Sequence, residues 1–424
     1  MRSFIAVTLL ALGLAAAAGA CSSSSSDATP PPPNDDSADA GADDGGGPVG
    51  YPAPHPAMPV AQTLGGAVMT APKLVAISFM GDPLQASVDN FVTQLASATA
   101  YWSGATAEYG VGPLTATPPV HLGETAPSMQ TDAQVQQWLK DEINGVDGGA
   151  AFPQPDANTQ YLIFYPSGSN VTSNGGSLCQ EFQGYHSSFA LSATTNVVYS
   201  VVGRCKPPVA GLAAIDEVTA EAAHEIIEAA TDPLPFAGPA WATLDDADDV
   251  WAVVGGGGEL GDLCAPFPGV FFRPPGVDNL VQRVWSNAAS KASHDPCQPQ
   301  GVSPYFNSAP VMKDMVQVTG APGGSFTGLG VKIPIGKSKT IELDLYSDAP
   351  TSGPWTVSAL DLNSAFFGGD ASLEFTFDKT TGQNGDKIML TIKAVSAGVI
   401  GASPFWIQNK LGSQTTIWTG LVGQ

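Results

Sequence analysis

The sequence predicts two folded domains: a mixed α/β domain over residues 63–300 and an all-β, immunoglobulin-like sandwich over residues 301–424. Two patterns predict this division. Before residue 300, apolar runs of strand length alternate with stretches in which apolar residues recur every three or four positions, as on one face of a helix. After residue 300, short segments alternate apolar and polar residues between turns, which is typical of a sandwich.

The α/β domain is predicted from three apolar runs and three periodic stretches. The runs predict buried strands at Lys73–Phe79, Gln160–Tyr165 and Asn196–Val202. The periodic stretches predict helices at 83–104, Asp132–Ile143 and Asp216–Ala230. The last helix is predicted to end at Asp232-Pro233, because proline cannot continue a helix.

The C-terminal domain is predicted from about seven alternating segments. They are Val331–Ile335, Thr340–Tyr346, Trp355–Leu360, Leu373–Phe377, Lys387–Val395, Pro404–Asn409 and Thr415–Leu421. This half contains no histidine and no cysteine, so we expect an accessory module rather than a catalytic one.

The N-terminus predicts export. Arg2 precedes an apolar run from Phe4 to Leu14, and small residues then lead to Cys21. This arrangement predicts a lipoprotein signal peptide over residues 1–20 and lipidation at Cys21, although Ala18 stands where leucine is usual; a plain secretory signal is the alternative. The Ser-, Pro-, Asp- and Gly-rich residues 21–62 predict a disordered spacer. We therefore expect the protein in the cell envelope, lipid-anchored at the outer membrane or cell surface, or else secreted.

The charge balance excludes two classes of partner. The chain has 16 basic and 39 acidic side chains, a net charge of −23. Nucleic-acid binding depends on neutralising phosphates with Lys and Arg, so no nucleic-acid partner is expected. Anionic lipid headgroups would also repel the chain, so contact with a membrane is expected through the lipid anchor only.

The cysteines predict disulfide bonds. If Cys21 carries lipid, an even set remains in an exported chain: Cys179, Cys205, Cys264 and Cys297. Pairing by proximity joins Cys179 to Cys205 and Cys264 to Cys297, which is the simplest of three possible connectivities.

A predicted helix carries the sequence His224-Glu225-Ile-Ile-Glu228. Residues four apart lie on one face of a helix, so His224 and Glu228 can bind one zinc ion. The spacing is that of the H-E-x-x-H zinc helix with its second histidine replaced, and Glu225 occupies the place of the general base. On the basis of this helix, we expect the α/β domain to resemble that of a metallopeptidase.

The third metal ligand has several candidates. Asp232 ends the helix, and Glu259 and Asp262 lie in a glycine-rich loop. His186 follows Cys179 in the segment Gly-Tyr-His-Ser. The alternative is a histidine–carboxylate network without metal, because buried charges need partners but those partners need not be ions.

Several segments together resemble a group of exported bacterial proteins that is distantly similar to the plant phosphate-induced (EXORDIUM-like) family. They are His224–Pro233 (HEIIEAATDP), Trp241, Glu259–Cys264 (ELGDLC) and Val281–Asn287 (VQRVWSN), with Gly184–Ser187 (GYHS) also fitting the group. The resemblance covers roughly residues 70–300 and implies an extracellular, cell-wall-associated protein. The plant proteins generally lack the matching His-Glu pair, so the resemblance does not itself imply hydrolysis.

Two hypotheses follow from these residues. The first is a lipid-anchored, zinc-dependent, peptidase-like metallohydrolase. In it, His224 and Glu228 bind the metal with Glu259, Asp262 or Asp232, and Glu225 activates water. Its substrate would be a peptide or a cell-surface polymer. The second is a non-catalytic EXORDIUM-like surface protein with a structural ion or no metal.

Overall fold

The computed structural model describes residues 50–146, 152–205, 212–299, 301, 303–321 and 324–424. The predicted signal peptide, the predicted lipidation site Cys21 and residues 22–49 of the predicted spacer lie outside these ranges. Within them, no helix combines the length and the apolar character that crossing a bilayer requires.

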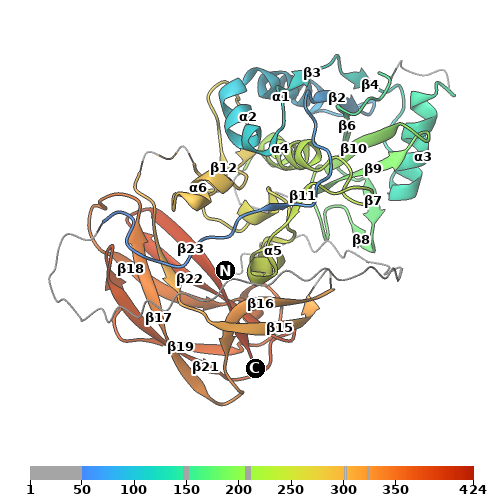
Figure 1. Ribbon diagram of the computed structural model, residues 1–424. Helices are drawn as coiled ribbons and strands as arrows, with labels where there is room; N and C mark the ends of the chain where they lie inside the picture. Colours follow the sequence, from blue (N-terminus) through green and yellow to red (C-terminus); the bar gives the residue numbers. More distant parts are fainter. Residues whose placement is uncertain (1–49, 147–151, 206–211, 300, 302, 322–323) are drawn as a thin grey trace, which may run out of the picture.

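A six-stranded mixed sheet forms the centre of the α/β part (Figure 1). Its order is β3 (Thr115–Ala116), β2 (Lys73–Ser78), β6 (Thr159–Tyr165), β10 (Asn196–Gly203) and β9 (Gly184–Ala190), and β4 (Val120–His121) also pairs with β2. The neighbours β2, β6 and β10 run parallel, and β9 is antiparallel to β10. The three strands predicted from apolar runs are confirmed, because central parallel strands are buried on both faces.

Helices cover both faces of this sheet. Leu74 and Ala76 share a core with α1 (Gln85–Ser97), α2 (Thr99–Thr106) and α4 (Ala214–Thr231). Their neighbours Val75 and Ile77 point the other way, into a second core with α3 (Asp132–Ile143), because side chains alternate along a strand. The predicted helix at 83–104 is two helices, which meet at the non-helical residue Ala98.

Short elements complete the α/β part. They are β1 (Gln62–Thr63), β5 (Met129–Thr131), β7 (Asn170–Ser173), β8 (Gly176–Ser177), β11 (Trp241–Thr243), α5 (Asp249–Gly255), β12 (Phe271–Phe272), β13 (Val281–Gln282) and α6 (Asn287–Lys291). The predicted disulfides Cys179–Cys205 and Cys264–Cys297 are both present, so pairing by proximity is confirmed.

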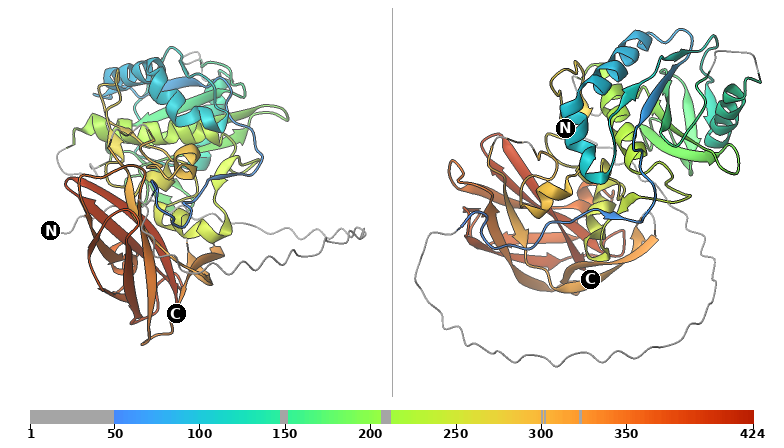
Figure 2. Two further views of the ribbon diagram at one scale, coloured as in Figure 1. Left: turned by 60° about the vertical axis from the view of Figure 1, so that its left-hand side comes forward. Right: turned by 45° about the horizontal axis from the view of Figure 1, so that its top comes forward.

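Two sheets make up the C-terminal part, which lies beside the α/β part in Figure 2 and shares one hydrophobic core with it. One sheet has the order β14 (Phe306–Pro310), β17 (Ser338–Ser347), β21 (Lys387–Ala394) and β19 (Leu373–Phe377). The other has β15 (Asp314–Ala321), β16 (Gly324–Lys332), β23 (Gln414–Gly423), β22 (Ser403–Leu411), β18 (Trp355–Asp361) and β20 (Thr381–Gly382). The short helix α7 (Leu362–Ala365) follows β18. Six of the seven predicted strands are found. The prediction at Val331–Ile335 was wrong for its last three residues, because β16 ends at Lys332 and a turn follows. The β-rich character of this half is confirmed.

The segment 50–63, drawn in blue in Figure 1, runs along both parts of the molecule. The ring of His55 stacks on Tyr346 with 3.5 Å between the centroids. The backbone N–H of Ala61 donates to Oδ1 of Asn287 at 2.8 Å. Residues 50–62 of the predicted spacer therefore pack against folded structure, because this Pro-rich stretch carries apolar side chains that the acidic residues before it lack.

Glu217, on α4, lies away from the metal-ligand candidates and provides a test of burial. Its side chain is buried, and neither carboxylate oxygen has a hydrogen-bond partner among the described residues. Burial raises its pKa to about 7. The folded protein therefore holds this proton more tightly than the unfolded chain, and stability is lost as the pH rises from about 4.5 to about 7.

Glu217→Gln is therefore expected to raise the free energy of unfolding by about 1–2 kcal/mol at pH 8 and to change it little at pH 5. Urea unfolding at the two pH values measures this difference. The matched control is Glu374→Gln, which removes one partner of an exposed ion pair and should change stability little at either pH. An equal gain at pH 5 and pH 8 would contradict the assignment to a buried, titrating carboxyl.

Candidate metal centre

Helix α4 brings the predicted zinc-binding motif into the core. Its small and branched apolar residues, among them Ala222, Ala223 and Ile226, are fully buried against the sheet. Gly184 on β9 permits this close approach, since a Cβ there would lie 2.9 Å from a carboxylate oxygen of Glu221. The helix is therefore a buried element, and the charged side chains that it carries need partners inside the protein.

The two ligands predicted from helix spacing face each other. Nε2 of His224 lies 3.0 Å from Oε2 of Glu228, one helical turn further on. The loop after α5 supplies a third group, because Oδ1 of Asp262 lies 3.6 Å from the same nitrogen. The backbone N–H of Asp262 also donates to Oε1 of Glu228 at 3.2 Å. One ligand atom each from His224, Glu228 and Asp262 can be chosen so that all lie within 4.8 Å of one another.

Gly261 lets this loop approach the helix. A Cβ at this position would lie 2.7 Å from Nδ1 of His224 and 2.8 Å from Oε1 of Glu228, closer than real Cβ atoms come. The backbone of Gly261 has φ −70°, which any residue can adopt, so the requirement for glycine comes from space alone.

Gly261→Ala is accordingly expected to weaken zinc binding by at least about tenfold without removing a ligand, because it pushes Asp262 away from the helix. Zinc titration followed by calorimetry measures this effect. Gly123→Ala is the control, since a Cβ at Gly123 meets nothing within 4 Å. Unchanged zinc affinity in Gly261→Ala would show that this loop does not form part of the site.

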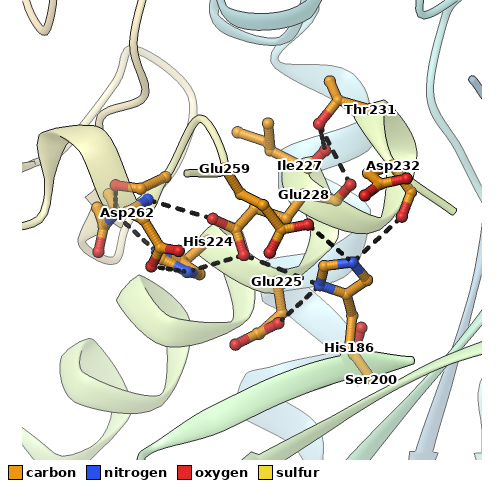
Figure 3. Close-up of polar contacts among 12 residues, drawn as sticks. His186, Ser200, His224, Glu225, Ile227, Glu228, Thr231, Asp232, Glu259 and Asp262 are labelled. Atoms are coloured by element: carbon orange, nitrogen blue, oxygen red, sulfur yellow. Dashed lines mark hydrogen bonds and ion pairs between the residues drawn. The ribbon is translucent and has the colours of Figure 1, made fainter. Parts of the chain in front are cut away.

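His186 approaches the same helix from the sheet. It shares a face of β9 with Gly184, whereas the intervening Tyr185 points into the other core. Its Nδ1 lies 3.4 Å from Oε2 of Glu225 and 3.8 Å from Oε2 of Glu228 (Figure 3). Its Nε2 lies 3.4 Å from Oε1 of Glu259. His186, Glu228 and Glu259 form a second group whose ligand atoms lie within 4.8 Å of one another.

The remaining predicted residues lie beside this second group. Glu225 contacts His186 rather than the ring of His224 (Figure 3). Asp232 ends α4, where its Oδ1 accepts the N–H of Ala240 at 2.8 Å and its backbone oxygen lies 3.2 Å from Nε2 of His186. All of the carboxylates named as metal ligands from the sequence, namely Glu228, Asp232, Glu259 and Asp262, therefore gather in one cluster.

Two residues of the site were not identified from the sequence. Nε2 of Gln282 lies 2.8 Å from Nδ1 of His224 and donates to the carbonyl of Gly261 at 2.9 Å, so it holds the ring and the loop together. Glu221 lies half-buried one turn before His224, and removal from water raises its pKa to about 8. Gln282 belongs to the two-residue strand β13, which is too short to produce a sequence pattern.

The cluster contains more carboxylates than positively charged partners. Burial by itself would lower the pKa of His186, but the charges of Glu259 and of the helix glutamates outweigh it and raise the pKa to about 10. Burial raises the pKa of Glu259 and of Asp262 well above their usual values. In the described ranges, the ion-pair partners of these carboxylates are histidines, with no lysine or arginine among them.

The most exposed carboxylates of the cluster are those of the loop. The side chains of Glu228 and His186 are 3% and 4% exposed, whereas that of Asp262 is 20% exposed. The arrangement can hold a cation and offers it water or a small group from the side of Asp262 and Glu259. Four further aspartates, in the segment 245–249, belong to neither group of candidate ligands. They lie in and around a short 3₁₀ turn (Asp246–Asp248) and at the start of α5.

Comparisons with known proteins assign no family to this chain. No protein-family model matches it, and no curated protein matches it. Among solved structures, domains 4 and 5 of the S-layer protein SbsC match with 14% identity and a TM-score of 0.16, over 27% of this chain and 54% of that one. A chimeric titin Z1Z2 matches with 14% identity and a TM-score of 0.15, over 28% of this chain and 94% of that one. Likenesses this weak support no conclusion about the fold or the function.

Proposed function

We propose that this chain is a lipid-anchored protein of the cell envelope and a zinc-dependent, peptidase-like hydrolase. The observation that carries the proposal is the convergence of His224, Glu228 and Asp262 from a helix and a loop onto one point. Because no lysine or arginine of the described residues pairs with these carboxylates, a bound cation is the partner that best compensates their charge.

The donor set fits zinc. Zinc binds histidine nitrogen and carboxylate oxygen, and catalytic zinc sites commonly have three protein ligands and an open position. Gln282 orients the ring, because its side-chain amide donates to Nδ1 of His224 and Nε2 then faces Glu228 and Asp262. When bound at such a site, zinc polarises a substrate carbonyl and makes water a stronger acid.

Glu225 is the candidate for moving the proton. Its Oε2 is buried without a hydrogen-bond partner among the described residues, and burial raises its pKa. A carboxylate of raised pKa accepts a proton more readily, which is the property required of a general base. His186, at 3.4 Å, holds the Glu225 side chain in place.

A second candidate function is supported by the burial of the cluster. Side chains that are 3–4% exposed, such as Glu228 and His186, suit an ion that stabilises the fold as well as one that binds a substrate. In that case the chain is a non-catalytic, EXORDIUM-like surface protein. Turnover separates the two functions, because only an accessible metal hydrolyses a substrate.

The envelope location is supported by the two disulfides, which persist in oxidising compartments. Lipid anchoring is proposed from the sequence before Cys21. Cys21→Ser is expected to move the protein from the membrane fraction to the soluble fraction of the envelope. Retention in the membrane fraction would overturn the anchor.

The test of hydrolysis uses zinc-loaded protein and labelled casein, a general protease substrate. Wild-type protein is expected to release labelled peptides, and Glu225→Gln is expected to lose at least about 100-fold of this rate while it keeps its zinc. Glu374→Gln, on the exposed surface of the sandwich, is the control. Bound zinc in a wild-type protein that releases no peptide would favour the structural ion. No bound zinc would overturn the hydrolase and favour a non-catalytic surface protein without metal.

A further inference from the structure

We infer that the cluster holds two divalent ions, and that Glu228 is the ligand they share. This inference rests on the proposed function, which assigns the first ion to His224, Glu228 and Asp262. The second ion is assigned to His186, Glu228 and Glu259. Figure 3 shows the two histidines on either side of Glu228.

Glu228 is placed to serve both groups. Its Oε2 lies 3.0 Å from Nε2 of His224 and 3.8 Å from Nδ1 of His186. A single carboxylate oxygen is thus near one nitrogen of each histidine. Sites with two metal ions hold them about 3.5–4 Å apart, a separation that a shared carboxylate can span.

His186 has carboxylates on both of its nitrogens. Oε2 of Glu225 lies 3.4 Å from Nδ1, and Oε1 of Glu259 lies 3.4 Å from Nε2. Both distances are longer than a charge-assisted hydrogen bond, which is about 2.7–2.9 Å. The ring and these two carboxylates are therefore too far apart to satisfy one another fully, and His186 and Glu259 each have a ligand atom free to join Glu228 around one ion.

Unpartnered oxygens around His186 are a separate indication of a ligand. Oε2 of Glu225 and Oδ2 of Asp232 are buried and have no hydrogen-bond partner among the described residues. The two residues are only 3% and 0% exposed. Buried carboxylate oxygens without partners are costly, and Oε1 of Glu259, a candidate ligand of the second ion, is also buried without a hydrogen-bond partner among the described residues.

The charge of the cluster also favours a second ion. The cluster contains five carboxylates, those of Glu225, Glu228, Asp232, Glu259 and Asp262. Four of them, all but that of Asp232, lie within ion-pair distance of a histidine. With all five carboxylates ionised and both histidines neutral, one divalent ion leaves three negative charges uncompensated, whereas two divalent ions leave one. Two ions therefore allow most of these carboxylates to be ionised together.

The test is the zinc content of the purified protein, measured by elemental mass spectrometry after loading and dialysis. We expect two zinc ions per wild-type chain, and one per chain in each of His186→Ala and His224→Ala. His121→Ala is the matched control, because His121 is a half-exposed surface histidine paired with Asp89. It should keep both ions.

The other outcomes separate this inference from the proposed function. One zinc per wild-type chain, lost in His224→Ala and kept in His186→Ala, overturns the second ion and leaves the first site standing. Two ions that both remain in His186→Ala also overturn the assignment. No zinc in the wild type overturns both proposals. Cobalt(II) titration of wild-type protein needs no variant. We expect the visible absorption to rise until two equivalents of cobalt have been added and then to level off. Levelling off at one equivalent would overturn the second ion, even if His186→Ala failed to fold.

Discussion

Replacing Cys264 and Cys297 together by serine is expected to lower the free energy of unfolding by about 4 kcal/mol. The disulfide closes a loop with a sequence separation of 33 residues, and the loss follows from the greater entropy of an unfolded chain without that link. The bond also holds the metal-site loop, because Cys264 lies two residues after Asp262 in the same 3₁₀ turn, η3 (Asp262–Cys264). We therefore expect weaker zinc binding as well.

Urea unfolding and zinc titration of the same variant measure the two effects. The comparison variant replaces Cys179 and Cys205, whose sequence separation of 26 residues predicts a similar loss of stability. That variant leaves the loop of Asp262 linked, so it should keep the zinc affinity of the His224 site. Wild-type zinc affinity in the Cys264/Cys297 variant would show that the loop is positioned without its disulfide.

The sequence was sufficient for the elements whose burial is uniform. Strands β2, β6 and β10 are mainly apolar because both of their faces are covered, and α4 is recognised by its Ala and Ile residues around the motif. Strand β14 was missed because its buried residues include Asn307 and Ser308, whose polar groups are satisfied by hydrogen bonds inside the sandwich. No apolar run or alternation distinguishes such a strand.

The site could be predicted only as far as local spacing reaches. The pair His224 and Glu228 follows from the helix, and the aspartate and glutamate candidates follow from its end and from the next loop. The contribution of His186 depends on β9 lying antiparallel beside β10 and under α4, which is a tertiary arrangement. For the same reason, the contact of Glu225 with His186 was not foreseen from its position in the motif.

Glu228→Gln is expected to abolish the stabilisation of the protein by zinc. For wild-type protein, zinc at about 100 times its dissociation constant should raise the free energy of unfolding by about 2.7 kcal/mol, which corresponds to a rise in Tm of about 3 °C for a chain of this size. Glutamine has nearly the same size as glutamate but lacks the charge that lies 3.0 Å from His224, so affinity should fall by at least about 100-fold. Thermal unfolding is measured with and without zinc for each variant. The zinc-induced shift in Tm is then compared, so that a difference in metal-free stability between variants does not affect the comparison.

Glu221→Gln is the matched control for this experiment. Glu221 lies on the same helix and has a pKa raised to about 8, so it is largely neutral at pH 7 and glutamine replaces it closely. It belongs to neither group of metal-ligand candidates, and its variant should keep the full zinc-induced shift in Tm. If both variants lost the shift, the loss would reflect disturbance of α4 rather than removal of a ligand. If both kept it, zinc would bind elsewhere, and Glu228 would be a partner of the two histidines only.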